Sequence, residues 1–100
     1  MKRLNHWIDG ARTDGRSERT APVTDPATGA QTGEVVLATL SDVDAVVASS
    51  VTAYESWREA SLSKRTDILF AYRHLLDQNR AELARAISSE HGKVFADALG

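Results

Sequence analysis

Glycine and proline are unevenly distributed along this chain of 100 residues, and their distribution most constrains the fold. Residues 1–40 contain four glycines and two prolines, whereas residues 41–91 contain neither. Both residue types interrupt helices and are typical of turns. The sequence therefore predicts two parts: short β-strands and turns over residues 1–40, and three to four amphipathic α-helices over residues 41–100.

Short strands are expected in the first part, where apolar and β-branched residues stand between turn-forming residues. The expected strands cover residues 7–10, 19–23 and 33–38. The polar residues 14–17 connect the first two strands, so these two strands are a candidate hairpin.

A turn is expected at Asp25-Pro26-Ala27-Thr28-Gly29. Pro26 fixes the backbone φ angle at the first central position, and Gly29 accepts a positive φ. The Asp25 carboxylate can accept a hydrogen bond from the backbone two residues further on. These residues therefore predict a tight connection before the third strand.

Apolar residues recur at helical spacing in the second part, which predicts amphipathic helices. The first helix should cover residues 42–57, because Ser41 and Asp44 have the spacing of a capping box. Ser61 or Ser63 can cap the second helix. The apolar stripes of these two helices consist of Val43, Val46, Val47, Val51 and Tyr54, and of Ile68, Leu69, Tyr72, Leu75 and Leu76.

A third helix is expected between Asn79 and Gly92. Asn79 and Glu82 repeat the capping-box spacing, and glycine commonly ends a helix. A further apolar run begins at Val94 and reaches Gly100 without a polar cap. We therefore expect the chain to be truncated from a longer protein, with a frayed terminus as the alternative.

The composition narrows the classes of function. The net charge is −2, which favours neither a nucleic acid nor an anionic membrane as partner. The chain contains no cysteine, so these residues can form no disulfide, thiolate metal site or cysteine nucleophile. No apolar leader segment is visible near Met1, and a cytoplasmic location is expected.

Histidine and aspartate are the candidates for acid–base or metal chemistry. His6, His74 and His91 include no pair four residues apart, the spacing that places two imidazoles on one metal ion. Asp42 and Asp44 fall in the expected first turn of a helix, where the free amides stabilise negative charge. We therefore predict no catalytic, cofactor-binding or metal-binding residue within this chain.

Several short motifs occur in a characteristic order along the chain. They are His6-Trp7-Ile8-Asp9-Gly10, Asp25-Pro26-Ala27-Thr28-Gly29, Asp42-Val43-Asp44-Ala45-Val46-Val47, Trp57, Arg65 with Ile68-Leu69, and Glu90-His91-Gly92-Lys93. In this combination the chain resembles the N-terminal portion of the aldehyde dehydrogenase superfamily, an α/β fold with a Rossmann-type cofactor domain. Residues 90–100 are most similar to its CoA-acylating methylmalonate-semialdehyde dehydrogenase branch.

The resemblance implies an enzyme that oxidises an aldehyde with NAD through a cysteine thiolate. In this branch the resulting thioester passes to coenzyme A with loss of the substrate's carboxyl group, which gives propionyl-CoA or acetyl-CoA. Residues 1–100 would form the N-terminal part of the NAD-binding domain of a homodimer or homotetramer. The family's cysteine, its glutamate base and its oxyanion-binding asparagine match no residue of this chain, which is therefore expected to be inactive alone.

Two alternatives remain open at this point. The parent could belong to a hydrolytic branch of the same superfamily, of the succinate-semialdehyde or betaine-aldehyde type. The chain could instead be a stand-alone, non-catalytic helical module that binds a partner through the faces of Val43, Val47, Ile68 and Leu76.

Overall fold

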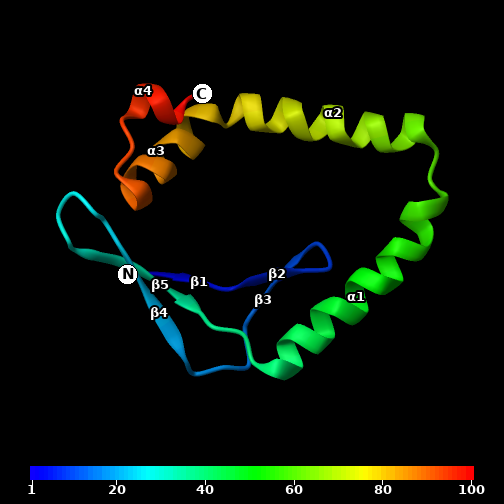
Figure 1. Cartoon of the computed structure of the whole chain (residues 1–100), viewed down its shortest axis with the longest axis horizontal. Coiled ribbons are helices and arrows are strands. Elements are labelled where there is room, and N and C mark those ends of the chain that lie inside the picture. The colour runs from blue at the N-terminus through cyan, green and yellow to red at the C-terminus, as the bar shows by residue number, and fades with distance from the viewer. The chain divides into compact units, whose positions relative to one another are not determined.

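The computed structural model describes all of residues 1–100 and contains five strands and four helices (Figure 1). Strands and turns come first and helices follow, which confirms the expected order. The contacts divide the chain into two compact units. One consists of Met1–Thr24 and Gln31–Glu59, and the other of Asp25–Ala30 and Ala60–Gly100.

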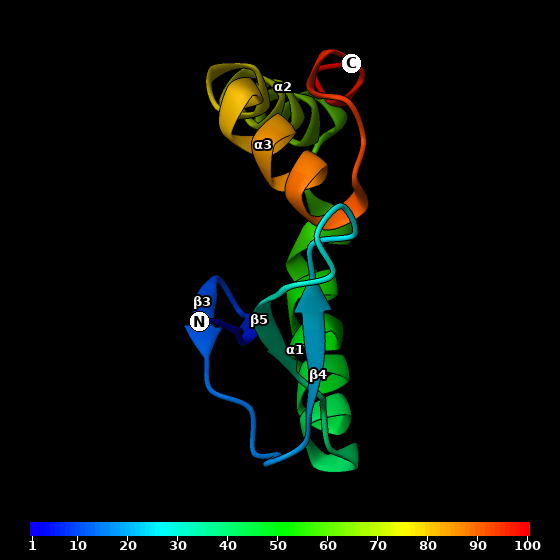
Figure 2. The same cartoon turned by 90° about the vertical axis from the view of Figure 1, so that its left-hand side faces the viewer.

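A three-stranded sheet forms the centre of the first unit. Its strand order is β1-β5-β4, with β5 parallel to β1 and antiparallel to β4. Figure 2 shows β4 beside β5. Val36 at the end of β5 is only 3 % exposed. The strands are β1 (Lys2–Leu4), β4 (Thr20–Thr24) and β5 (Gln31–Val36).

The hairpin lies elsewhere than the sequence predicts. Strand β2 (His6–Ile8) pairs with β3 (Ala11–Thr13), and the strand expected as its partner pairs with β5 instead. Asp9 and Gly10 connect β2 to β3 with φ angles of 53° and 71°. Two consecutive residues with positive φ match the right-handed twist of a hairpin, so this short connection forms the turn.

The turn that begins at Asp25 is confirmed. The Asp25 carboxylate accepts a hydrogen bond from the Ala27 amide at 2.8 Å, and the Asp25 carbonyl accepts one from the Gly29 amide at 2.7 Å. Gly29 has a φ of 72°. The side-chain bond and the positive φ are those expected from the residue types.

Helix α1 (Leu40–Glu59) has a capping box, but two residues earlier than predicted. The Thr39 hydroxyl accepts a hydrogen bond from the Asp42 amide at 3.1 Å, and the Asp42 carboxylate accepts one from the Thr39 amide at 2.9 Å. The expected box of Ser41 and Asp44 is therefore wrong. Thr39 and Asp42 have the same spacing, and their reciprocal bonds start the helix earlier.

Helix α2 (Leu62–Gln78) begins as predicted from Ser61. The Ser61 hydroxyl accepts a hydrogen bond from the Lys64 amide at 3.1 Å, which satisfies one free donor of the first turn. Ser61 is therefore the cap, and not Ser63.

Helix α3 (Arg80–His91) follows α2 after the single residue Asn79. The Asn79 side chain donates to the Leu75 carbonyl at 2.8 Å and caps the end of α2, so the predicted capping box at the start of α3 is wrong. Gly92 ends α3 with a φ of 79°, and its amide donates to the Ser88 carbonyl at 2.9 Å, as expected for a terminal glycine.

Helix α4 (Phe95–Ala98) is a single turn that contacts α3. The Arg85 guanidinium lies 5.9 Å from the centre of the Phe95 ring, within the range of a cation–π interaction. Ala84 of α3 is completely buried. The contact between α4 and α3 thus joins the expected fourth apolar run to the third helix.

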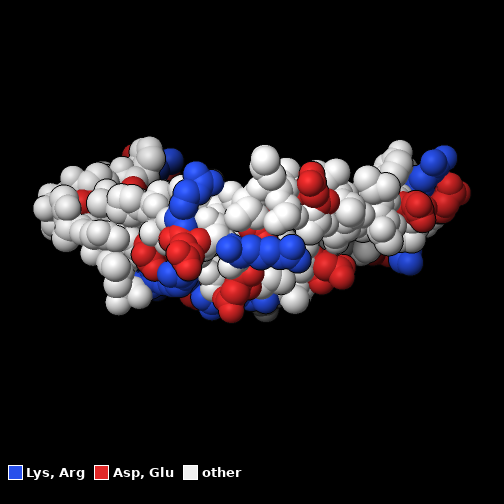
Figure 3. Space-filling model, turned by 90° about the horizontal axis from the view of Figure 1, so that it is seen from below, with Lys and Arg blue, Asp and Glu red and all other residues white.

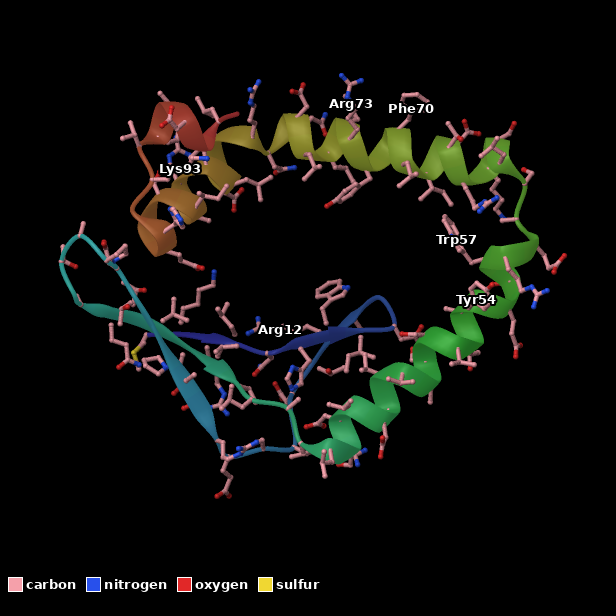
Figure 4. All side chains as sticks on the ribbon, in the orientation of Figure 1. Arg12, Tyr54, Trp57, Phe70, Arg73 and Lys93 are labelled. Atoms are coloured by element: carbon pink, nitrogen blue, oxygen red, sulfur yellow. The ribbon has the colours of Figure 1, made fainter.

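The apolar stripes of α1 and α2 form as predicted, but they remain open to solvent. Except for the half-buried Val46, their large side chains are 40–61 % exposed, and Tyr54 and Trp57 project from α1 in Figure 4. Val36 and Ala84 are the only buried hydrophobic residues. Helical periodicity thus sets the stripes, and the chain does not cover them itself.

Candidate binding surfaces

The histidines do not come together in the structure. His6 lies in β2, His74 lies in α2 and His91 ends α3. No group of three or more His, Cys, Asp or Glu side chains is placed to hold a metal ion.

Asp42 belongs to the cap of α1. It is only 9 % exposed, and the Arg16 guanidinium lies 4.0 Å from its carboxylate. Hydrogen bonds from the Thr39 amide and then from the Thr39 hydroxyl lower the pKa of Asp42 below 3.8. Every one of these contacts stabilises the carboxylate in its capping position, which is the structural role expected for it.

A small hollow of about 200 Å³ lies between β2 and the start of α1. His6, Asp42 and Val46 contribute to its lining. The Nε2 atom of His6 is buried without a hydrogen-bond partner. The ideal position of a Cβ atom on Gly15 lies 2.8 Å from Nε2, so the imidazole occupies the space beside a residue without a side chain.

A second hollow, of about 360 Å³, lies along β1 and the hairpin. Its two arginines are already engaged within the first unit. Arg12 donates to the Arg3 carbonyl at 3.0 Å, and the Arg3 guanidinium pairs with Glu34 at 2.8 Å. Figure 4 shows Arg12 on the hairpin. These contacts link β1 to β3 and β5.

The largest of these three hollows, of about 400 Å³, belongs to the second unit. Phe70 and Arg73 project from the same side of α2 beside it (Figure 4). Sequence reasoning missed this site, because Phe70 does not belong to the apolar stripe of α2. Its lining residues are Phe70, Arg73, His74, Leu76, Asp77, Arg80, Leu99 and Gly100.

The charged surface is mixed. Acidic and basic atoms lie interspersed on the face shown in Figure 3. None of the helices combines the length and apolar composition needed to cross a membrane.

These surfaces supply binding groups but no nucleophile paired with a base. The chain has no cysteine, and Thr39 already caps the start of α1. A dinucleotide site needs a glycine-rich turn between a strand and a helix, and the residues that precede α1, Ala38 and Thr39, provide none. The residues present therefore do not fit NAD.

The fold and its surfaces define an α/β segment of short strands and amphipathic helices whose apolar faces lie open. The profile of the aldehyde dehydrogenase family matches residues 13–100. The chain therefore belongs to the aldehyde dehydrogenase family.

Individual relatives agree with this assignment. The chain is 40 % identical over 100 residues to malonate-semialdehyde dehydrogenase 2 of Shouchella clausii and 36 % identical over 100 residues to that of Oceanobacillus iheyensis. Each alignment covers 100 % of this chain and 21 % of the relative. The chain thus spans about a fifth of the length of these relatives.

A solved structure shares the same fold. It is a protein of Sinorhizobium meliloti 1021 assigned as a methylmalonate-semialdehyde dehydrogenase and complexed with NAD. The TM-score is 0.96 at 39 % identity, over 100 % of this chain and 20 % of that one. This likeness confirms the expected α/β class.

Proposed function

We propose that this chain is the N-terminal part of the NAD-binding domain of an NAD-dependent aldehyde dehydrogenase that acts on malonate or methylmalonate semialdehyde. The identity of 40 % over the whole chain to a malonate-semialdehyde dehydrogenase carries this proposal. The NAD complex of the relative with a TM-score of 0.96 supports the choice of cofactor.

The proposed reaction forms a thioester on a cysteine of the parent enzyme, and coenzyme A then accepts the acyl group. NAD takes up the hydride in the oxidation step. The product is acetyl-CoA from malonate semialdehyde or propionyl-CoA from methylmalonate semialdehyde, after loss of the carboxyl group. We propose that the parent is a cytoplasmic homodimer or homotetramer.

The role proposed for residues 1–100 is to support the catalytic parts of the enzyme. The exposed stripes of α1 and α2 favour this role, because burying a large apolar side chain completely from full exposure is worth about 1.5–3 kcal/mol, and much of that gain is still available to side chains that are about half exposed. The relatives are about five times as long as this chain. In such a protein the further residues can cover these stripes.

The decisive experiment is an assay of NADH formation by the complete protein that contains this segment. Malonate and methylmalonate semialdehydes are offered with and without coenzyme A, and succinate semialdehyde and betaine aldehyde serve as controls. Acyl-CoA formation that requires coenzyme A is expected. Release of the free acid without coenzyme A would place the protein in a hydrolytic branch, and the absence of any aldehyde oxidation would refute the proposal.

The isolated chain of residues 1–100 tests the supporting role. No NADH formation is expected from it, because it contains no cysteine. Turnover by the isolated chain would show that these residues are themselves catalytic. Stoichiometric binding of an unrelated partner through α1 and α2, by a protein without dehydrogenase activity, would favour the helical module.

A further inference from the structure

The chain contains two Asp-Gly pairs, and the structure restrains them differently. They are Asp9-Gly10 and Asp14-Gly15. In such a pair the backbone nitrogen of the glycine can attack the carboxyl carbon of the aspartate and close a five-membered succinimide ring. Glycine hinders this attack least, because it has no Cβ atom. Each pair is therefore a candidate site of covalent change, and its freedom to move controls how fast the change occurs.

The first pair is exposed and weakly restrained. Asp9 and Gly10 are both exposed and form the turn at the tip of the β2–β3 hairpin (Figure 1). The Asp9 carboxylate accepts no hydrogen bond and takes part in no ion pair. The φ of Asp9 is 53°, which is unfavourable for a residue with a side chain. Only three residue pairs join β2 to β3, and a two-stranded sheet this short opens readily.

The second pair is held by two contacts. The Asp14 carboxylate accepts a hydrogen bond from the Asn5 side-chain amide at 2.7 Å. Gly15 is half-buried, and the ideal position of a Cβ atom on it lies 2.7 Å from Cγ1 of Val36, which is only 3 % exposed. Ring closure at Asp14 therefore requires that the hydrogen bond break and that a packed segment of backbone move.

We propose that Asp9 is a site of spontaneous isomerisation to isoaspartate and that the fold protects Asp14 from the same reaction. The contrast between the free carboxylate in the hairpin turn and the bound carboxylate beside a packed glycine carries this proposal. The reaction is intramolecular, so it needs no ligand or enzyme, and its only co-reactant is water.

The atoms balance over two steps. The Gly10 nitrogen forms a bond to the Asp9 carboxyl carbon, the bond from that carbon to its hydroxyl breaks, and the hydroxyl leaves with the amide proton as water. A water molecule then adds to one of the two ring carbonyls. Cleavage of the nitrogen from the side-chain carbonyl restores aspartate. Cleavage from the main-chain carbonyl gives isoaspartate, which adds one methylene group to the main chain of the turn.

Incubation of the complete protein in H₂¹⁸O at neutral pH tests the proposal, because every hydrolysis of a succinimide introduces one heavy oxygen atom. Trypsin cleaves after Arg12 and so places the two pairs in separate peptides, residues 4–12 and 13–16. Mass spectrometry measures the label, and electron-transfer fragmentation locates isoaspartate. Asp9 should react about tenfold faster than Asp14, the upper end of the effect of one hydrogen bond. Equal rates, or no isoaspartate at Asp9, would overturn the proposal.

The same incubation in guanidinium chloride separates the effect of the fold from that of the neighbouring residues. Both pairs lose their contacts in the unfolded protein, so their rates should converge. An undiminished preference for Asp9 would overturn the proposal, because the local sequence and not the fold would then select the site.

Two variants test the two sites separately. Asp9→Glu keeps the charge but would need a six-membered ring, so the label in residues 4–12 should disappear while the label at Asp14 stays. Asn5→Ala removes the donor to Asp14 and should raise its rate by roughly twofold to tenfold without changing that of Asp9. Label that persists in Asp9→Glu, or an unchanged rate at Asp14 in Asn5→Ala, would overturn the proposal. Unchanged circular dichroism confirms that the variants fold, and no readout depends on dehydrogenase activity.

Discussion

Two properties of Gly92 make its replacement by alanine unfavourable: its positive φ angle and the position of Pro26 beside it. A comparison with Gly29 separates their contributions to stability. Its φ of 79° is unfavourable for a residue with a side chain, and a Cβ atom in the ideal position would lie 3.1 Å from Cγ of Pro26. Gly29 has a similar φ of 72°, but a Cβ atom there would meet nothing within 4 Å. Gly92→Ala and Gly29→Ala therefore share the backbone strain, and only the former adds a steric contact.

The expected costs follow from these two geometries. An alanine in the left-handed conformation costs roughly 1–2 kcal/mol. The contact with Pro26 requires a shift of only a few tenths of an ångström, so it should add about 1 kcal/mol, the lower end of the cost of overpacking. We therefore expect losses of about 1–2 kcal/mol for Gly29→Ala and about 2–3 kcal/mol for Gly92→Ala.

Urea unfolding followed by circular dichroism measures both changes in the free energy of unfolding. Pro26→Ala, introduced alone and together with Gly92→Ala, completes a double-mutant cycle. The coupling between the two positions should be about 1 kcal/mol. Equal losses for the two glycine variants, or a coupling near zero, would refute the reasoning that the end of α3 is packed against the turn at Pro26.

Three further predictions concern the first unit. Thr39→Ala should lower the free energy of unfolding by about 1 kcal/mol in urea, because the Asp42 amide loses its acceptor. Ser41→Ala should change it by less than about 0.5 kcal/mol, and the reverse order would contradict the observed cap. The pKa of Asp42 is lowered from 3.8 by Thr39, so its ionised form stabilises the fold above that pH, and this contribution is lost as the pH falls through the folded-state pKa. The urea midpoint of Asp42→Asn should therefore depend less on pH in this acid range, and parallel pH profiles would contradict this. Gly15→Ala would place a Cβ atom 2.7 Å from Cγ1 of Val36 and should cost about 1–3 kcal/mol in a thermal or urea unfolding experiment. A Val36→Ala background should reduce that cost, and strictly additive losses would argue against the contact.

Features that depend on neighbours a few residues away could be predicted from the sequence. The Asp25 turn, the Ser61 cap and the terminal Gly92 all satisfy backbone groups within four residues of themselves. Their chemistry is local, so the residue types are sufficient to identify them.

Competing local signals were harder to rank. Asp9-Gly10 forms the hairpin turn, although the longer polar connection at residues 14–17 also fits a turn. Thr39 and Asp42 form the cap of α1 where Ser41 and Asp44 have the same spacing. In each case both candidates satisfy the same rule, and the packing of the surrounding strands and helix selects one.

The candidate site was not predictable, because it depends on residues that are distant in the chain. Arg80, in α3, reaches the carbonyl of Leu99, which follows α4, and both residues line the same hollow. Phe70 does not share the helical spacing that relates the other large apolar residues of α2. Only its position outside the apolar stripe of α2 could have drawn attention to it.

The sequence by itself determined the division into strands followed by helices, the apolar stripes of those helices and the absence of a cysteine nucleophile. Periodicity and residue type are sufficient for these properties, because each follows from local backbone preferences or from composition. The tertiary structure alone decided that β1 pairs with β5, that Pro26 lies beside Gly92 where a Cβ atom would point, and that the hollow beside Phe70 exists. These features join residues far apart in the chain, and their contacts are set by packing that no local pattern contains.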